Sequence, residues 1–293
     1  MSNTSMELVK ILRDRTQVGM MDCKKALEEA NGDIEQAVEI LRKKGAAVAA
    51  KRADNATNHG RIESYVTADG KTGVLIQSAC ETDFSANTDA MRDFLHTVAE
   101  HIATANPASI DALLSESLTT NKGLTVRQYM DELVAKICEN IKINNFVRFH
   151  IANHGLVGVY IHPGSTVGVM VELEADKDTA MHLETLKQLA KDICMQIAVT
   201  NPLCTEPKFL DATVLERERA LAQDQLKDST KPANVIEKII EGKLGKFYQD
   251  VCLLQQPFIK EDKLTVQQHV ENTGKKLGLV ITVKQFKRFA IGR

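Results

Sequence analysis

An acidic and an aromatic residue, Asp83 and Phe84, stand side by side directly after Thr82, a pairing that suits recognition more than bond making. They follow an apolar run at 73–78 that predicts a strand, and precede a helical pattern that starts near Thr88. Such a junction gives outward-pointing side chains a rigid support. A phenyl ring favours burial, so an exposed Phe84 would mark contact with a partner. Alternatively, Asp83 caps the helix and Phe84 belongs to the core.

Motifs of the common enzyme classes are absent from the sequence. It contains no glycine-rich phosphate loop, no Gly-x-Ser-x-Gly elbow and no His-Glu-x-x-His pair. His150 and His154 are four residues apart, but a Gly and a change from strand to loop separate them from any helical ligand face. None of the six Cys stands in Cys-x-x-Cys spacing. We therefore predict a protein that is not an enzyme and holds no metal or cofactor.

The composition indicates an ordinary globular protein. The 293 residues are 43% hydrophobic, and 37 basic and 39 acidic side chains leave a net charge of −2. This balance argues against broad binding of nucleic acid, which needs a dominant basic field. No segment approaches the roughly 20 apolar residues that span a bilayer. Scattered single Cys and the lack of a leader-like N-terminus predict a cytoplasmic protein without membrane contact.

Three helical patterns within the first 45 residues predict a small bundle with an aliphatic core. Thr4 and Glu7 have the spacing of a capping box before the first helix, and Gly32 ends the second. Met20 and Met21 are placed in the turn before the second helix. They either form a flexible contact surface or fill gaps in the small core.

The middle of the chain predicts two α+β units with the same plan, a hairpin followed by a helix. The first hairpin turns at Asp69 and Gly70, and its helix starts near Thr88 and stops before Pro107. The second hairpin turns at His162. The strands of this second hairpin are predicted at 156–161 and 167–173, and its helix at 179–198. Between the two units, a helix is predicted at 126–141 and a strand at 145–151.

Charged helical patterns at 207–242, interrupted at 228–232, predict an antiparallel helical hairpin around a short loop that contains Pro232. This hairpin either projects from the core and serves contacts in a homodimer, or packs locally. A strand-like run at 279–283 and a basic finish close the chain.

Several segments resemble one family. The stretch 12–27, Leu-Arg-Asp-Arg-Thr-Gln-Val-Gly-Met-Met-Asp-Cys-Lys-Lys-Ala-Leu, closely resembles the N-terminal signature of the elongation factor Ts family, and 29–33 continues it. Cys80-x-Thr82-Asp83-Phe84 resembles that family's second signature. Further similar pieces are 135–141, Ala-Lys-Ile-x-Glu-Asn-Ile, and 256–258, Gln-Pro-Phe. The resemblance spans nearly the whole chain.

The chain departs from the family pattern at a few positions. Ser85 stands where the family usually has Val, and Cys138 where it has Gly. Gln77 and Ala79 replace an acidic residue and Asn before the Cys of the second signature. The tail ends at Arg293 without the family's acidic, Gly-rich stretch and final helix.

The resemblance implies an α+β fold with a ubiquitin-associated-like (UBA-like) N-terminal bundle, a two-subdomain core with antiparallel sheets and a coiled-coil insertion. This layout agrees with the patterns above. The predicted domains are 1–54 for the bundle with its linker, 55–144 for core subdomain N, 145–204 with 233–263 for core subdomain C, 205–232 for the helical-hairpin insertion, and 264–293 for a C-terminal module.

The resemblance also implies a function in protein biosynthesis, that of a guanine-nucleotide exchange factor for elongation factor Tu. Thr82, Asp83, Phe84 and Ser85 would then insert into the partner's nucleotide-binding domain and disturb its magnesium site. Seven further residues match family contact positions less strongly: Met20, Met21, Lys24, Ile137, Cys138, Glu139 and His162.

Two other classes of function stay open at this point. In the first, the N-terminal bundle captures peptides, the core is a scaffold and Phe84 plays no part. In the second, an unrecognised enzyme has a site spread across both halves. A buried carboxylate or His with a perturbed pKa in a cleft would indicate that site.

Overall fold

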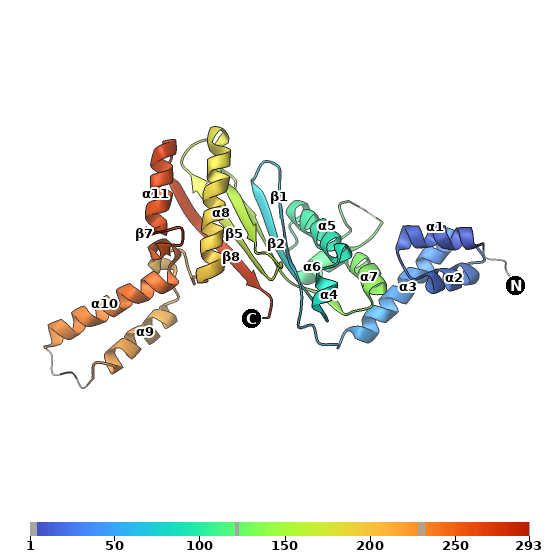
Figure 1. Ribbon diagram of the computed structural model, residues 1–293, viewed down its shortest axis with the longest axis horizontal. Helices are drawn as coiled ribbons and strands as arrows, with labels where there is room; N and C mark the ends of the chain where they lie inside the picture. Colours follow the sequence, from blue (N-terminus) through green and yellow to red (C-terminus); the bar gives the residue numbers. More distant parts are fainter. Residues whose placement is uncertain (1–4, 121–122, 228, 230–231, 293) are drawn as a thin grey trace.

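The computed structural model describes residues 5–120, 123–227, 229 and 232–292. Figure 1 shows an elongated molecule, with a helical bundle at the N-terminal end, a helical hairpin at the other end, and two sheets with their helices between them. Both sheets have three antiparallel strands. The predicted α+β class is confirmed.

The N-terminal bundle contains three helices, α1 (Met6–Thr16), α2 (Met20–Glu29) and α3 (Ile34–Arg52). Its core is aliphatic, as predicted, and includes Leu12, Leu27 and Leu41. Ser5 caps α1 by accepting a hydrogen bond from the Glu7 amide at 3.1 Å. The predicted capping residue, Thr4, lies outside the described residues.

Met20 and Met21 lie in the first turn of α2, so placing them in the turn before it was wrong. The Gly19 carbonyl already accepts hydrogen bonds from the amides of Asp22 and Cys23, which starts the helix at Met20. The small core is filled by Cys23 and its apolar neighbours instead. Both methionines are exposed, Met20 to 47% and Met21 to 65%. They therefore belong to the surface.

Helix α3 extends beyond the bundle and packs on α7 (Val126–Ile137) of the core. Gly45 permits the close approach, because a Cβ atom there would lie 3.1 Å from both Ala135 Cβ and the Asp131 carbonyl oxygen. Arg42 Nε donates to Glu132 Oε1 at 2.7 Å beside this crossing. The bundle is thus joined to the core by packed side chains as well as by the chain itself.

The first half of the core is a sheet of order β1-β2-β3 with helices on one face. Its strands are β1 (Ile62–Val66), β2 (Thr72–Cys80) and β3 (Ile141–His150), and its other helices are α4 (Asp83–Ala86), α5 (Asp89–Ala105) and α6 (Ile110–Ser115). Helix α6 was not predicted. The helix predicted to 141 stops at Ile137, because Cys138 adopts a left-handed conformation with φ 61° and its amide closes the last turn on Val134.

The second half repeats this arrangement with a sheet of order β4-β5-β8. Its strands are β4 (His154–Ile161), β5 (Val167–Ala175) and β8 (Ile281–Ala290), and its helices are α8 (Leu183–Thr200) and α11 (Val266–Leu277). Helix α8 starts at Leu183 rather than 179, because a short 3-10 turn, η1 (Ala180–His182), precedes it. A small β6–β7 ribbon (Pro257–Phe258 and Glu261–Thr265) lies before α11; neither the ribbon nor α11 was predicted.

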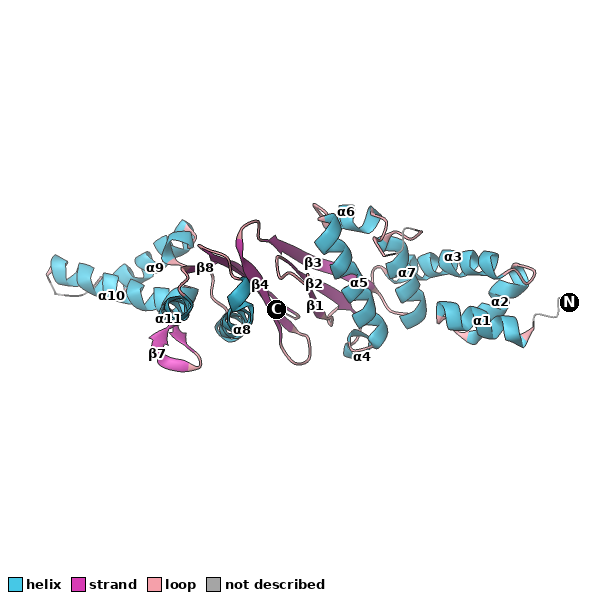
Figure 2. Cartoon of the chain, turned by 90° about the horizontal axis from the view of Figure 1, so that it is seen from above, coloured by secondary structure: helices cyan, strands magenta, loops and turns pink. Residues whose placement is uncertain are grey.

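The two sheets pack face to face, and helices cover both outer faces (Figure 2). Alternation along β2 places Val74 and Ile76 against the helices and Leu75 against the second sheet. Among the described residues, the buried apolar side chains between the sheets are Ile62, Leu75, Phe149, Ile151, Val157, Met170 and Phe289. This layer joins the two halves of the core into one unit.

Corresponding features recur in the two halves. The pairing of β2 with β3 shifts register after Gln77, and that of β5 with β8 shifts after Glu172. Both final helices begin with a capping box whose first residue is Thr125 in α7 and Thr265 in α11. The matching Arg148 and Arg288 donate to the carbonyl oxygens of Ala103 and Ala198 in α5 and α8. The two halves therefore provide an internal comparison, position by position.

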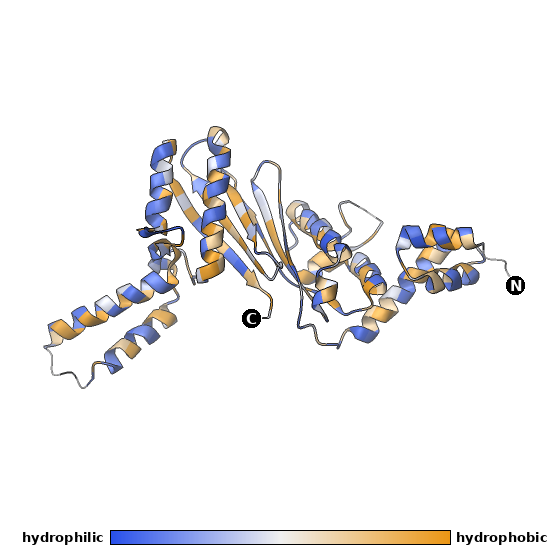
Figure 3. Ribbon diagram, viewed as in Figure 1, coloured by the Kyte–Doolittle hydropathy of each residue, from blue (hydrophilic) through white to orange (hydrophobic). Residues whose placement is uncertain are grey.

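Helices α9 (Ala212–Asp224) and α10 (Ala233–Val251) form the hairpin and pack through Ala222, Ile240 and Leu244. Figure 3 shows apolar and polar stretches alternating along both helices. At the base of the hairpin, Cys204 and Cys252 are free thiols 3.5 Å apart. The homodimer through this hairpin and the domain boundaries remain predictions. Across the described residues, no helix is both long enough and apolar enough to cross a membrane.

Candidate functional site

The segment Thr82–Phe84 is held at the end of β2, where the chain turns into α4. The Thr82 hydroxyl accepts from the Ser85 amide at 3.2 Å, so Thr82 caps this helix and Asp83 does not. Phe84 is 81% exposed, whereas Ser85 and Ala86 on the other side of the helix are buried. The interpretation that placed Phe84 in the core is wrong.

A set of hydrogen bonds surrounds α4 and keeps it in place. The Cys80 thiol donates to the Thr82 carbonyl at 3.1 Å, and the Thr88 hydroxyl to the Ser85 carbonyl at 2.9 Å. Asn87 Nδ2 donates to the Asp83 carbonyl at 2.9 Å. The backbone of this short helix is therefore well bonded, and the phenyl ring projects from a fixed base.

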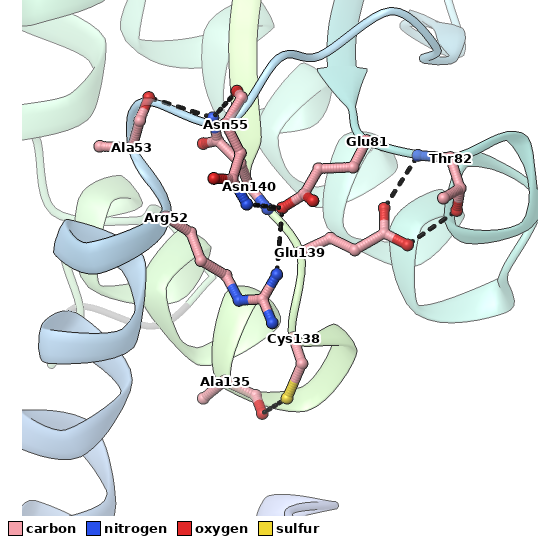
Figure 4. A network of polar contacts seen from close by, with 9 residues as sticks. All are labelled: Arg52, Ala53, Asn55, Glu81, Thr82, Ala135, Cys138, Glu139 and Asn140. Carbon is pink, nitrogen blue, oxygen red and sulfur yellow. Dashed lines mark hydrogen bonds and ion pairs between the residues drawn. The ribbon is translucent and has the colours of Figure 1, made fainter.

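The carboxylate of Glu139 bonds Thr82 twice, as Figure 4 shows. Oε2 accepts from the Thr82 amide at 3.0 Å, and Oε1 from the Thr82 hydroxyl at 2.7 Å. Burial acts to raise the pKa of Glu139, but hydrogen bonds from Ser85 and Thr82 outweigh it and the net pKa lies below the ordinary value. Glu139 is thus ionised at neutral pH and holds the start of α4 through charge-assisted bonds.

A second carboxylate, Glu81, joins the same region to the segment that follows α3 (Figure 4). Its Oε1 accepts from the Asn140 amide at 2.6 Å, from Asn55 Nδ2 at 3.0 Å and from Arg52 Nη1 at 3.3 Å. These bonds lower the pKa of Glu81, and the bond from the Asn140 amide has the largest effect. Asn140 Nδ2 in turn donates to the carbonyls of Ala53 and Asn55, at 3.1 and 2.8 Å.

The lowered pKa values of Glu81 and Glu139 predict a loss of stability in acid. A carboxyl group whose pKa is depressed by folding contributes stability that is complete above its ordinary pKa, about 4.3, and is lost as the pH falls through its folded-state pKa. We expect a variant with Glu81→Gln and Glu139→Gln to be less stable than the wild type at pH 7, with the difference shrinking below about pH 4.3. Thermal unfolding from pH 7 to pH 3 measures this, and a difference that is independent of pH would contradict it.

The thiol nearest in sequence to the exposed ring, that of Cys80, is not activated as a nucleophile. The Cys80 thiol lies beneath Thr82, where burial and then the Glu139 charge raise its pKa to about 11. It therefore stays protonated at neutral pH. Across the described residues, no three His, Cys, Asp or Glu side chains gather as a metal ion would require. What the site presents is a phenyl ring beside the Asp83 carboxylate.

The other predicted site residues fall into three places. Ile137 and Cys138 lie at the end of α7 beside Glu139; Ile137 is half-buried and Cys138 is exposed. His162 is exposed in the β4–β5 turn, with Nδ1 3.1 Å from the Tyr160 hydroxyl. The Ser165 carbonyl in that turn accepts from the Ile62 amide, so the turn lies at the end of the sheets where β1 starts.

Met20, Met21 and Lys24 are exposed on α2 of the N-terminal bundle and form a surface apart from α4. Figure 1 shows α2 near the N-terminal end of the molecule. Lys24 Nζ lies 4.0 Å from Glu28 Oε1 in an exposed pair, so its charge stays accessible to solvent. The structure thus brings Glu139 onto the Thr82–Ser85 segment, and leaves the α2 residues on another part of the molecule.

Reasoning from the sequence missed Glu81, Asn140 and the residues that bind them. The available signal was position, because Glu81 directly follows β2 and Asn140 directly precedes β3. The pairing of Cys80 with Ile141 brings these two strand ends together. A predicted helix that ran through Glu139 and Asn140 concealed this juxtaposition.

Comparison with known proteins shows similarity over almost the whole chain. Residues 81–293 match the family model described as Elongation factor TS. The chain is 44% identical to Elongation factor Ts of Trichlorobacter lovleyi over 283 residues, which cover 96% of this chain and 90% of that protein. It is 41% identical to Elongation factor Ts of Clostridium perfringens over 284 residues, covering 97% and 91%. The protein of the same name from Clostridium acetobutylicum is 39% identical over 288 residues, covering 98% and 92%.

Proposed function

This chain belongs to the elongation factor Ts family, and from that membership we propose that it is a guanine-nucleotide exchange factor of elongation factor Tu. It binds elongation factor Tu in its GDP form, disturbs the Mg²⁺ and phosphate site, and promotes GDP release and GTP loading. The observation that carries the proposal is that Phe84 is 81% exposed on α4, whose N-cap residue Thr82 is bonded by the Glu139 carboxylate. An exposed aromatic ring on a rigid support is typical of a contact residue.

Nucleotide exchange needs no bond to be made or broken. It needs a conformation of the partner that binds nucleotide poorly, and Phe84 stabilises that conformation by filling an apolar gap that opens in it. Full burial of a phenyl side chain contributes about 1.5–3 kcal/mol. The adjacent Asp83 brings a negative charge toward the cation and phosphates, where it alters the local electrostatics. Because α4 is already ordered, little conformational entropy is lost on binding.

The coupling between the two ligands of elongation factor Tu is reciprocal. If this protein weakens the binding of GDP, then GDP weakens the binding of this protein by the same factor. The complex is therefore transient, and incoming nucleotide releases the factor for another cycle.

Residues outside α4 supply additional contacts. Met20, Met21 and Lys24 touch the partner's nucleotide-binding domain from the N-terminal bundle, and the two exposed methionines suit such an adaptable surface. Cys138 and His162 are exposed and available for contact, and Ile137 is half-buried beside them. Both carboxylate oxygens of Glu139 are engaged by Thr82, so its contribution to binding is indirect.

Release of fluorescently labelled GDP from purified elongation factor Tu tests the function directly. We expect release to become much faster as this protein is added, with a rate that saturates at high concentration. No acceleration at saturating concentration with a cognate partner would overturn the proposal. The chain would then be a binding scaffold, and capture of peptides by the N-terminal bundle would be the next property to measure.

A variant with Met20→Ala and Met21→Ala is expected to need about fivefold more protein for half-maximal GDP release. Truncating a side chain that is exposed in the free protein and partly buried in the complex costs about 1 kcal/mol of binding free energy. A loss of 1.4 kcal/mol corresponds to a factor of ten in affinity. The matched control is Met181→Ala, since Met181 is 93% exposed but lies in η1 of the second half. Equal behaviour of the control and the double variant would remove the α2 surface from the partner contact.

A further inference from the structure

Each half of the core has an equivalent hydrogen bond at the end of its second strand. Glu81 follows β2 and accepts from the Asn140 amide at 2.6 Å. Asp176 follows β5 and accepts from the Val280 amide at 2.7 Å. In both halves the donor directly precedes the third strand of the sheet, which starts at Ile141 or Ile281. This bond belongs to the common fold.

The side chains just before the third strand differ between the halves. The first half has Glu139 and Asn140 there, where the second half has Leu279 and Val280. Leu279 is buried in the apolar cluster under α8, and Val280 is 66% exposed. An apolar pair is thus compatible with this fold. The carboxylate and the amide of the first half need another explanation.

These two polar side chains bind the start of α4, in whose place the second half has the 3-10 turn η1, and the segment that leaves α3. Glu139 binds Thr82 at the start of α4, which presents Phe84. Asn140 is only 4% exposed and binds the carbonyls of Ala53 and Asn55, in the segment that leaves α3. In the second half, Thr179 lies four residues after Ala175, as Phe84 lies four residues after the matching Cys80, and Thr179 is buried.

The segment that carries both side chains is itself tightly constrained. Cys138 ends α7 in a left-handed conformation, and Ile141 pairs with Cys80 in the sheet. Glu139 and Asn140 lie between these fixed points, so the backbone that carries both side chains is held on either side. Helix α7 also carries the contact with Gly45 of α3. The N-terminal bundle and the Phe84 helix are therefore attached to the same short piece of backbone.

We infer that Glu139 and Asn140 are positioning residues of the exchange site. Glu139 holds α4, and Asn140 holds the segment after α3. Together they set the spacing at which Phe84 and the exposed residues of α2 meet the partner. The inference deepens the proposed function and rests on it. Neither residue needs to touch elongation factor Tu in order to act.

The test replaces each residue by its counterpart from the second half, as Glu139→Leu and as Asn140→Val. A loosened element occupies its binding-competent arrangement only part of the time, so the apparent affinity falls by that fraction. We expect the protein concentration for half-maximal GDP release to rise about tenfold for Glu139→Leu and about fivefold for Asn140→Val. The release rate at saturation should change less than about twofold, because the bound arrangement is the same.

Hydrogen–deuterium exchange of the isolated variants separates positioning from general stability. The amides of Ser85 and Asn87 should exchange faster in Glu139→Leu, and the amide of Asn55 faster in Asn140→Val. Each variant is the control for the other, since a general loss of stability would accelerate both regions equally. Glu139→Gln keeps the shape and can still accept one of the two bonds, so it should fall between Glu139→Leu and the wild type even if the Leu variant folds poorly.

Three results would overturn the inference. The first is a protein concentration for half-maximal GDP release that equals the wild-type value in both Glu139→Leu and Asn140→Val. The second is unchanged amide exchange in α4 of Glu139→Leu. The third is a lower saturating rate without a change in half-saturation, because that pattern belongs to a residue that acts in the conformation from which nucleotide leaves, as is expected of Phe84. If the wild type itself does not accelerate GDP release, the proposed function fails, and amide exchange alone decides whether Glu139 holds the helix.

Discussion

Replacement of Phe84 by Ala is expected to lower the rate of GDP release at saturating protein by about 30-fold, which corresponds to roughly 2 kcal/mol of stabilisation lost from the complex. Phe84 is 81% exposed and lies outside the apolar clusters of the core. Its removal should therefore leave the melting temperature unchanged. The loss falls on the saturating rate because the ring acts in the conformation from which nucleotide leaves.

Stopped-flow measurement of labelled GDP release at several protein concentrations gives both the half-saturating concentration and the saturating rate. Phe209→Ala is the matched control, because Phe209 is also exposed, to 60%, but precedes the helical hairpin. Acceleration that survives Phe84→Ala would keep the function and assign the disturbance of the nucleotide site to other contacts. A loss that Phe209→Ala reproduces would point to a general effect of removing surface aromatic residues.

Adding a methyl group at Gly73 or Gly168 is expected to destabilise the protein by about 2 kcal/mol in each case. A Cβ atom at Gly73 would lie 2.4 Å from Val157 Cγ1 in the second sheet. A Cβ atom at Gly168 would lie 2.5 Å from Ile62 Cγ2 in the first. The two glycines occupy corresponding places in β2 and β5, and each lets the opposite sheet approach. Either substitution must push the sheets apart or force side chains out of their preferred rotamers.

Urea unfolding of Gly73→Ala and Gly168→Ala measures this loss. Gly242→Ala is the control, since Gly242 lies within α10 and a Cβ atom there meets nothing within 4 Å. That control should be neutral or stabilising by up to about 1 kcal/mol, because Ala favours a helix interior over Gly. Unchanged stability in both sheet variants would mean that the layer between the sheets is loosely packed.

The sequence by itself determined the family and much of the plan of the fold. The signature at 12–27 and Cys80-x-Thr82-Asp83-Phe84 indicated the family that the comparisons then showed. Alternating and helical periodicities predicted the two hairpins with their helices and the helical hairpin near the C-terminus. These features are local, because the side chains of one strand or helix repeat with its own period. Helix α11 was missed because its buried face is small, with Val266, Val270 and Gly274.

Only the tertiary structure decided how the site is held. Phe84 is exposed because Thr82 caps α4 while Ser85 and Ala86 face inward, an orientation that the sequence left open. Glu139 reaches Thr82 because β2 and β3, which are distant in the chain, pair at Cys80 and Ile141. Strand pairing joins segments that are distant in the chain, so the periodicity within one segment does not predict it. The same pairing turns one short segment of backbone into the common support of the Phe84 helix and the N-terminal bundle.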